Sequence, residues 1–248
     1  MPTEATDQSL SILIHGLSKS GKSTLAVTAP APRLYLDVES ASRFLDVKRV
    51  IWNPHTEAPP TYDGSWDTCV VPTRSWEDVL AVYQWLNSGA HPFDSVIIDS
   101  ISELQSRFIE KVGGRSQLTM QQWGDAFRQV VGLCRDIRDL TMHPTHPLKC
   151  IALTAMTKNV DGMWKPYVSG QLQTVLPYLW DINSYLYVEQ VRDLDGGVTE
   201  VRRLLTRRSG DFEAGERVGG KIPPVVDNPN ITEMIRAIFG TPLPAPEV

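Results

Sequence analysis

The chain has 248 residues, of which 42% are hydrophobic and 21% are charged, and its formal net charge is -5. This composition excludes a wholly disordered chain. The negative net charge disfavours a protein whose whole surface is basic, but it is compatible with a local basic groove. The three cysteines are widely spaced without a Cys-x-x-Cys pair, so neither a disulfide framework nor a zinc knuckle is indicated, and a reducing compartment is the simplest setting.

Signals for export or membrane insertion are missing from the sequence. Residues 1–10 lack a basic start followed by an apolar stretch, and no run approaches membrane-spanning length. We therefore expect a soluble, cytoplasmic protein without a membrane partner. Residues 10–240 are expected to form one domain, with flexible segments at 1–9 and 241–248.

Short apolar runs alternate with helical patterns along the chain, which is typical of parallel strands joined by crossover helices. The strands predicted in chain order are Ser11–His15, Arg33–Val38, Cys69–Pro72, Phe93–Ser100 and Lys149–Thr154. The helices predicted are Ser23–Ala29, a segment from the Ser75/Asp78 capping box to Leu86, Ile101–Val112, Gln121–Leu140 and Ile231–Phe239 capped by Asn230. Residues 53–66 contain several prolines and glycines and are expected to form an irregular excursion.

Two later runs predict an antiparallel hairpin. Ser184–Glu189 and Val201–Thr206 read as strands joined by the turn Asp195-Gly196-Gly197, at an edge of the sheet. The predicted fold class is therefore α/β, with a mainly parallel central sheet flanked by helices and an antiparallel edge hairpin.

A glycine-containing loop between the first strand and the first helix carries the strongest functional signal. Its glycines let backbone N–H groups turn toward an anion, and the following helix presents its positive dipole end to phosphate. Lys22 is expected to hold the β- and γ-phosphates, and Ser23 to ligate magnesium. The predicted nucleotide-binding residues are Gly16, Leu17, Ser18, Lys19, Ser20, Gly21, Lys22, Ser23 and Thr24. The alternative, a chance match in a turn, is disfavoured because strand and helix stand where the mechanism needs them.

Two acidic residues follow predicted strands. Asp99 ends the most apolar strand, where phosphate-loop ATPases place a carboxylate that supports magnesium, although it could instead cap the helix from Ile101. Glu39 follows Leu34–Val38 at the same sheet edge and could orient the water that attacks the γ-phosphate; a solvated loop acid is the alternative.

Two polar segments offer weaker signals. The densest basic stretch comprises Arg202, Arg203, Arg207, Arg208, Arg217 and Lys221. One of these arginines could reach a γ-phosphate, within the chain or across a subunit interface, but solvated strand faces look similar. Lys158, Trp164, Lys165 and Tyr167 mix cations with aromatic rings. This mixture is typical of single-stranded DNA binding, and also of a lid or packing loop.

His143 and His146 flank a proline in a predicted turn. Metal ligation is possible in principle, but no carboxylate or cysteine cluster accompanies them. A polar connector is the favoured interpretation.

The chain resembles the RecA-like ATPases in its glycine loop, in the strand Leu34–Val38 followed by Glu39, and in the strand Val96–Asp99 followed by Ser100 and Ile101. The resemblance implies ATP and Mg²⁺ as cofactors and a water-activating role for Glu39.

More closely, the chain is similar to a phage and prophage family of short RecA-like ATPases linked to single-strand annealing and recombination. The features that match are Trp76-Glu77-Asp78, Trp123-Gly124-Asp125, the strand Ile151–Thr154, and the run from Pro166 and Gly170 to Pro177 and Asp181. Arg217, in the pair Glu216-Arg217, then becomes the candidate for an arginine acting on a neighbouring subunit. The implied partners are single-stranded DNA, further copies of the chain in a ring or filament, and a phage or host single-strand-binding protein. The implied location is the host cytoplasm.

Two departures from the family pattern bear on mechanism. Relatives often have a histidine after the strand Ile151–Thr154, whereas this chain has Ala155-Met156-Thr157, so the γ-phosphate sensor is Thr154, Thr157 or absent. The aromatic-x-x-alanine tether of many filament-forming recombinases is missing from Met1–Leu10, which argues against a filament but not against a ring.

The expected activity is slow ATP hydrolysis that is stimulated by DNA. Two alternatives share the same loop. The first is a small-molecule kinase, which the scarcity of arginine in residues 158–167 disfavours. The second is a non-catalytic module that uses nucleotide as an assembly switch.

Overall fold

The computed structural model describes residues 8–114, 116–192 and 197–240. Within these residues the strands are β1 (Leu10–His15), β2 (Arg33–Asp37), β3 (Arg49–Ile51), β4 (Thr68–Pro72), β5 (Ser95–Asp99), β6 (Cys150–Ala155), β7 (Thr157–Val160), β8 (Met163–Pro166), β9 (Ile182–Arg192), β10 (Val198–Leu205), β11 (Gly215–Glu216) and β12 (Val225–Asp227). The α-helices are α1 (Lys22–Ala26), α2 (Trp76–Leu86), α3 (Ile101–Gly113), α4 (Met120–Asp139), α5 (Leu172–Val175) and α6 (Ile231–Phe239). Short 3-10 turns, η1 (Ser42–Phe44), η2 (Leu140–Met142) and η3 (Leu176–Leu179), complete the list.

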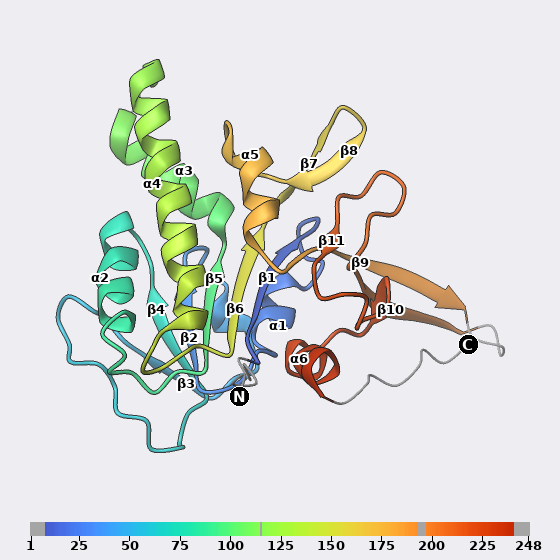
Figure 1. Ribbon diagram of the computed structural model, residues 1–248, viewed down its shortest axis with the longest axis horizontal. Coiled ribbons are helices and arrows are strands. Elements are labelled where there is room, and N and C mark those ends of the chain that lie inside the picture. Colours follow the sequence, from blue (N-terminus) through green and yellow to red (C-terminus); the bar gives the residue numbers. More distant parts are fainter. Residues whose placement is uncertain (1–7, 115, 193–196, 241–248) are drawn as a thin grey trace, which may run out of the picture.

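The main sheet runs in the order β12-β10-β9-β1-β6-β5-β2-β4-β3, with β11 paired to β9 (Figure 1). All pairs from β9 through β1 to β3 are parallel, whereas β10 pairs antiparallel with β9 and with β12. The predicted α/β class is therefore confirmed, including the antiparallel hairpin. The hairpin is not outermost, because β12 adds beyond β10.

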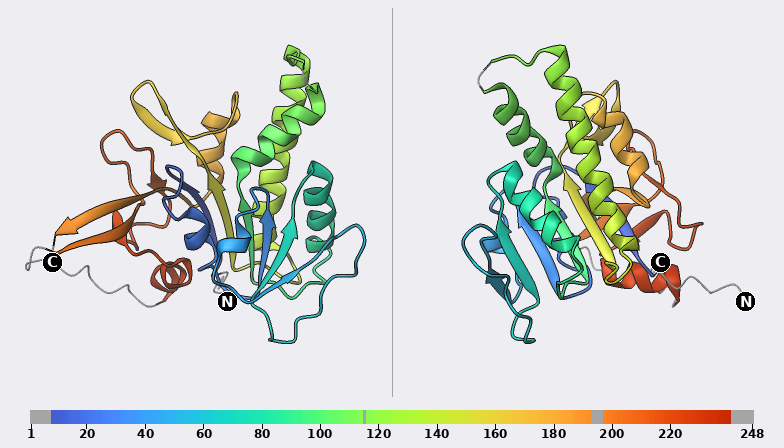
Figure 2. Two further views of the ribbon diagram at one scale, coloured as in Figure 1. Left: turned by 180° about the vertical axis from the view of Figure 1, so that it is seen from behind. Right: turned by 60° about the vertical axis from the view of Figure 1, so that its left-hand side comes forward.

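Alternating side chains of the central strands fill two cores. On β1, Leu13 packs into one core with α2, α3 and α4, while Ile12 and Ile14 face the other core with α1 and α6. The same alternation separates Leu34 from Tyr35 on β2. Strands buried on both faces read as continuous apolar runs because neither face meets water. Figure 2 shows the sheet between these two groups of helices.

Helix starts follow their sequence signals closely. Ser75 and Asp78 form the predicted capping box of α2, and Asn230 accepts a hydrogen bond from the Glu233 N–H at the start of α6. Each cap satisfies backbone donors that have no partner inside the helix, and such a cap is typically worth about 1 kcal/mol. The helix α1 ends at Ala26, earlier than the predicted Ala29, and a turn continues to Pro30.

A second, separate sheet consists of β7 and β8 alone. Asp161 and Gly162 join these strands, and both have positive φ angles, of 52° and 84°. Two consecutive left-handed residues form the tight turn whose twist suits a hairpin. Figure 1 shows this β7–β8 hairpin projecting from the end of β6.

Some expectations fall outside the described residues. Asp195 and Gly196 of the predicted turn lie there, as do residues 1–7 and 241–248 of the predicted flexible segments.

Candidate functional site

The carboxyl ends of β1, β2, β5 and β6 meet at one edge of the sheet, and a cavity of about 570 Å³ lies there. Ligands collect at this edge in parallel sheets because the loops that follow the strands converge on it. The cavity is lined by Gly16, Leu17, Ser18, Lys19, Gly21, Lys22, Ser23, Thr24, Glu39, Ala41, Phe44, Leu45, Asp99, Met156, Thr157 and Arg202. The predicted loop residues other than Ser20, which is buried and does not line the cavity, therefore share it with the predicted magnesium residues and Glu39.

The loop between β1 and α1 depends on glycine at two positions. A Cβ on Gly16 would lie 2.3 Å from the backbone oxygen of Leu186, so β9 leaves no room for a side chain. Gly21 has a φ of 96° and immediately precedes α1. Glycine is the residue that adopts this backbone region without steric cost. The two glycines shape a loop whose N–H groups can face an anion at the helix start.

Lys22 is the first residue of α1, and its side chain turns back over the loop. Its Nζ donates to the backbone oxygens of Gly16 at 3.0 Å and Leu17 at 2.9 Å. Burial lowers the pKa of Lys22, an effect opposed by the nearby carboxylates of Asp99 and Glu39. The amine is thus held at the mouth of the loop, where a polyphosphate would add oxygens as partners.

Asp99, at the end of β5, is the centre of a hydroxyl cluster. Ser23 Oγ donates to its Oδ2 at 2.5 Å, Tyr35 OH donates to the same oxygen, and Thr154 Oγ1 donates to Oδ1. Burial, followed by the charge of Asp99, raises the pKa of Tyr35, so its hydroxyl stays protonated and remains a donor. The cluster keeps the buried carboxylate satisfied and fixes its direction.

The Ser23 and Asp99 pair fits the requirements of magnesium. A hydroxyl and a carboxylate are hard oxygen donors, and Mg²⁺ is usually held by one or two protein groups together with substrate phosphates and water. No group of three or more His, Cys, Asp or Glu side chains within the described ranges could hold a metal by itself. The donor set therefore suits a cation that arrives with a polyphosphate.

Glu39 lies two residues beyond β2 and is held by a neighbouring strand end. The hydroxyl of Ser100 donates to its Oε1, since the parallel register that pairs Asp37 with Asp99 brings these loops together. Asp37 shapes the loop further by accepting from the N–H groups of Ala41, at 2.9 Å, and Ser42, at 3.2 Å. The second carboxylate oxygen of Glu39 has no hydrogen-bond partner in the described part of the chain, and Glu39 lines the cavity.

His15, the last residue of β1, ties the loop to a distant segment. Its Nε2 donates to the backbone oxygen of Glu213 at 2.7 Å, and its Nδ1 lies 3.2 Å from Thr157 Oγ1. Burial lowers the pKa of His15 to about 4, opposed by the Glu213 hydrogen bond and aided by the charge of Lys22. The ring is therefore neutral at physiological pH and acts as a structural link.

Acidification is expected to destabilise the fold through His15. Its pKa is about 4 in the folded chain against 6.5 for an ordinary histidine, so between these values the unfolded chain binds a proton that the folded chain does not. The contribution of His15 to the free energy of unfolding is therefore complete above about pH 6.5. It decreases by on the order of 3 kcal/mol as the pH drops toward about 4. Urea unfolding at several pH values measures this loss. His15→Gln should be less stable near neutral pH and less sensitive to acid; an unchanged pH slope in that variant would contradict the assignment.

Arg202 approaches the loop from β10. Its guanidinium Nε lies 2.7 Å from the position that a Cβ on Gly21 would occupy, and the residue lines the cavity. The next residue, Arg203, points to the opposite face, where it forms ion pairs with Glu189 and Asp227. Of the basic stretch singled out in the sequence, Arg202 is the residue that the fold brings to the loop.

Arg217 lies elsewhere. Its guanidinium donates to the backbone oxygens of Tyr178 and Trp180, both at 2.7 Å, and its Nε lies 3.6 Å from Asp181. It lines a different cavity, and its side chain is 54% exposed. A role for Arg217 on a neighbouring subunit stays a prediction.

The four residues predicted to contact DNA lie on or beside the β7–β8 hairpin. Lys158 and Lys165 are cross-strand partners, and the Lys158 amine lies 5.5 Å from the centre of the Tyr167 ring. Trp164 donates its backbone N–H to Asp211. The base of the hairpin reaches the nucleotide cavity, because Met156 and Thr157 line it.

Sequence reasoning missed Tyr35 and Ser100 as parts of the site. The sequence gave a weak indication for Tyr35, because a tyrosine hydroxyl within a buried apolar strand usually forms a hydrogen bond. The sequence offered Asp99 as the alternative cap of α3, whereas Ser100 is the residue that caps this helix, by accepting from the Glu103 N–H.

The histidines of the connector contact backbone oxygens and a neighbouring ring. His143 and His146 bond to the backbone oxygens of Asn87 and Phe93, and His146 packs against His91. The preference for a polar connector over metal ligation stays a prediction. No helix among the described residues is both long enough and apolar enough to cross a bilayer.

A family model described as an AAA domain matches residues 8–218. None of the curated proteins matches the chain. Similar solved structures include an ATPase from the type III secretion system of pathogenic bacteria, which is 15% identical with a TM-score of 0.42. That alignment covers 71% of this chain and 52% of the secretion ATPase, so this chain spans about half the length of that protein.

Two further structures are similar. The RadB recombinase is 14% identical with a TM-score of 0.41, over 82% of this chain and 84% of the recombinase. The genome packaging NTPase B204 from Sulfolobus turreted icosahedral virus 2, solved in complex with ATP-gammaS, is 14% identical with a TM-score of 0.33, over 76% of this chain and 78% of the NTPase.

Proposed function

The chain belongs to the AAA domain family, and we propose that it binds ATP together with magnesium and hydrolyses the γ-phosphate slowly, in a cycle coupled to single-stranded DNA. The observation that carries the proposal is the convergence of Lys22, Ser23, Asp99 and Glu39 on one cavity. Each lies at the end of a different strand or at the helix start, so the fold itself brings them together.

Binding rests on the loop and on the hydroxyl cluster. The N–H groups at the start of α1 and the Lys22 amine supply positive potential for phosphates. Ser23 and Asp99 would hold magnesium, whose bridging of phosphate oxygens neutralises developing charge. Tyr35 and Thr154 keep Asp99 directed toward this position.

Hydrolysis rests on Glu39. With Oε1 held by Ser100, the other carboxylate oxygen is available to orient a water molecule and accept its proton. Thr157, which lines the cavity and whose hydroxyl donates to the backbone oxygen of Lys165 at 3.0 Å, is the candidate sensor of the γ-phosphate. Thr154 is the alternative residue that the sequence left open.

Arg202→Ala is expected to weaken nucleotide binding about 10- to 100-fold, because a hydrogen bond to a charged group is worth about 1.5–3 kcal/mol. The measurement is titration with a fluorescent ATP analogue. Arg203→Ala is the matched control, since its neighbouring guanidinium pairs with Glu189 and Asp227 on the other face. Equal affinities for the two variants would remove Arg202 from the site.

DNA coupling is supported by the β7–β8 hairpin. Lys158, Lys165 and Tyr167 give it the cation and ring content that holds a single strand. Its base forms part of the nucleotide cavity, so γ-phosphate contacts at Thr157 could shift the hairpin. We propose that the protein acts in phage-type recombination or single-strand annealing. In this proposal it forms a homo-oligomer, either a ring or a filament, in which Arg217 reaches a neighbouring subunit. A phage or host single-strand-binding protein is a further partner.

The deciding experiment is the ATP turnover rate with and without single-stranded DNA, at low and high salt. We expect DNA to stimulate turnover, and salt to weaken the stimulation because phosphate contacts release counterions. Transfer of labelled phosphate to a small-molecule acceptor would favour the kinase alternative. Nucleotide binding without any turnover would favour the assembly switch.

A further inference from the structure

The loop that carries Glu39 is held by a second side chain of α3 besides Ser100. Arg107 lies in the middle of α3, and its Nη2 donates to the backbone oxygen of Val38 at 2.7 Å. Its Nη1 donates to the backbone oxygen of Thr73 at 3.0 Å. Val38 follows the last residue of β2, and Thr73 follows the last residue of β4. One guanidinium therefore joins the carboxyl ends of two neighbouring parallel strands.

The hydrogen bond to Val38 bears directly on Glu39. The carbonyl of Val38 and the N–H of Glu39 belong to one planar peptide group, so a donor that fixes the carbonyl also fixes the direction in which the chain enters Glu39. The N–H of Val38 donates to the backbone oxygen of Asp99 at 2.9 Å, and Val38 is buried. Both polar groups of Val38 are therefore held in place immediately before the glutamate.

The turn after Glu39 needs such support. Ser40 has a φ of 58°, in the left-handed region that is unfavourable for a residue with a side chain. A conformation of this kind persists where the surrounding contacts determine it. After the turn, the side chain of Asp37 accepts from the N–H groups of Ala41 and Ser42. Before the turn, the guanidinium of α3 holds the chain, so the Glu39 loop is anchored at both ends.

Arg107 is itself fixed in direction. Ser100, Glu103 and Arg107 are spaced three and four residues apart, so they lie along one face at the start of α3. Glu103 accepts from Arg107 Nε at 3.0 Å, and the two side chains are 34% and 30% exposed. Because a guanidinium is a rigid planar fork, a partner on Nε also sets the direction of both Nη groups. The face of α3 thus presents a hydroxyl and an oriented guanidinium to the Glu39 loop.

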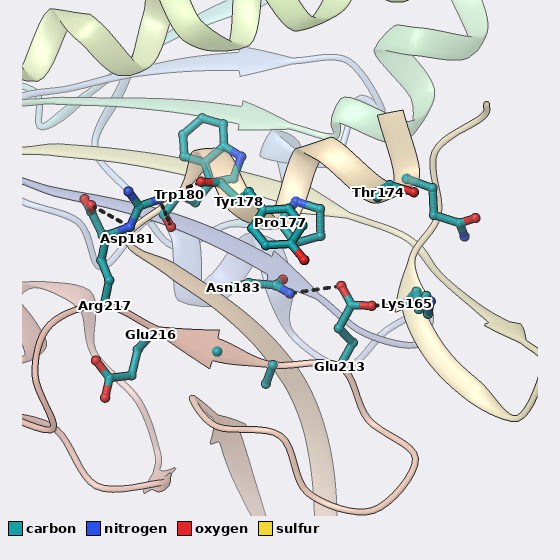
Figure 3. Close-up of a pocket in the computed structure, with 13 residues that line it drawn as sticks. Lys165, Thr174, Pro177, Tyr178, Trp180, Asp181, Asn183, Glu213, Glu216 and Arg217 are labelled. Carbon is teal, nitrogen blue, oxygen red and sulfur yellow. Dashed lines mark hydrogen bonds and ion pairs between the residues drawn. The ribbon is translucent and has the colours of Figure 1, made fainter. Parts of the chain in front are cut away.

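An arginine that bonds to backbone oxygens does not by itself mark a catalytic loop. Arg217 makes two such bonds, and Figure 3 shows it beside Asp181 and Trp180. The cavity drawn there shares no lining residue with the nucleotide cavity. Arg107 differs because the carbonyl that it holds immediately precedes a carboxylate lining the nucleotide cavity.

We propose that Arg107 is a positioning residue for Glu39, which fixes the peptide before the glutamate so that its carboxylate has a defined direction at the nucleotide cavity. This inference rests on the proposed function, in which Glu39 orients the attacking water. Arg107 does not line the nucleotide cavity, so it acts on the rate of the chemical step and not on the affinity for ATP. A displacement of about 1 Å in the reacting geometry can cost about 100-fold in rate.

The test compares two substitutions of Arg107. Arg107→Met keeps an unbranched stem and removes the donors, whereas Arg107→Lys keeps the charge without the planar fork. We expect Arg107→Met to slow single-turnover ATP hydrolysis about 10- to 100-fold, with the Kd for a fluorescent ATP analogue changed by less than about twofold. Arg107→Lys should show a smaller loss. Arg128→Met is the matched control, because Arg128 pairs with Asp125 on the exposed surface of α4 and does not line the cavity.

The decisive measurement places Arg107→Met in the Glu39→Gln background. If Arg107 acts through the Glu39 carboxylate, its loss should slow hydrolysis no further once that carboxylate is absent, so the two effects are not additive. An arginine that only stabilises the fold would lower the rate by the same factor in both backgrounds.

The outcomes separate this inference from the proposed function. Wild-type turnover in Arg107→Met, an equal loss in both backgrounds, or a loss of ATP affinity as large as the loss of turnover would overturn the positioning role and leave the proposed ATPase intact. A wild-type protein that hydrolyses no ATP, with or without DNA, would reject the proposed function and the positioning role together. If circular dichroism shows that Arg107→Met does not fold, Arg107→Lys and Glu103→Gln decide in its place. A loss of turnover that disappears in the Glu39→Gln background supports the role, whereas no loss, or the same loss in both backgrounds, rejects it.

Discussion

Replacing Lys22 with alanine is expected to abolish ATP turnover and to weaken ATP binding about 30-fold to several thousand-fold. Loss of one partner of a hydrogen-bonded charge pair typically costs about 2–5 kcal/mol, and every 1.4 kcal/mol is tenfold in affinity. The amine is positioned for this role before nucleotide arrives, because it already bonds to the backbone oxygens of Gly16 and Leu17. Titration with fluorescent ATP and steady-state phosphate release measure the two effects.

The control for this variant is Lys48→Ala, which removes an exposed lysine that does not line the nucleotide cavity. Circular dichroism should show both variants folded, since the hydrogen bonds of the Lys22 side chain to the described residues lie within its own loop. Lys22→Arg is informative as well, because a planar guanidinium keeps the charge and changes the geometry. Wild-type affinity in Lys22→Ala would remove the phosphate loop as the nucleotide site.

The sequence predicted the central sheet well, and the reason lies in burial. Strands β1, β2, β5 and β6 are enclosed on both faces, so they appear as unbroken apolar runs. Caps at Ser75 and Asn230 were readable because capping is local chemistry. Edge elements gave no such signal: Arg49–Ile51 is three residues long and has no buried side chain.

The β7–β8 hairpin was missed for a different reason. Its strands are four residues long each and carry no run of alternating polar and apolar side chains long enough to predict a strand. The Asp161-Gly162 pair between them was the available signal, since Asp-Gly favours the two-residue turn of a hairpin. Turn chemistry, rather than hydrophobic pattern, would have found this element.

The part of the candidate site that lies at the ends of the parallel strands was predictable from the sequence. Lys22, Asp99 and Glu39 follow parallel strands, and parallel strands share a carboxyl edge, so one cavity was expected. Arg202 was not individually predictable, because it reaches the loop through β10, whose place depends on the order β10-β9-β1. Contacts such as Tyr35 to Asp99 depend on the register of neighbouring strands, which one sequence does not reveal.

Glu39→Gln is expected to retain ATP binding and to lose about 100- to 10,000-fold in turnover, the usual contribution of a general base. Glutamine has nearly the same shape, and its amide oxygen can still accept the hydrogen bond from Ser100. The amide cannot take a proton from water at neutral pH, so only the chemical step should suffer. Single-turnover hydrolysis, with nucleotide affinity measured in parallel, separates the two effects.

The comparison variant is Glu110→Gln, which makes the same chemical change at an exposed position on α3 and should leave turnover unchanged. If Glu39→Gln hydrolyses ATP at the wild-type rate, another group activates the water. If the variant also binds ATP more weakly, Glu39 contributes to binding of the substrate itself. An interaction that stabilises the bound substrate and the transition state equally is seen in the affinity, not only in the rate of the chemical step. Ser100 holds one carboxylate oxygen of Glu39, and Glu39 lines the cavity. A carboxylate placed in this way should produce retained ATP binding with lost turnover when it is replaced by an amide.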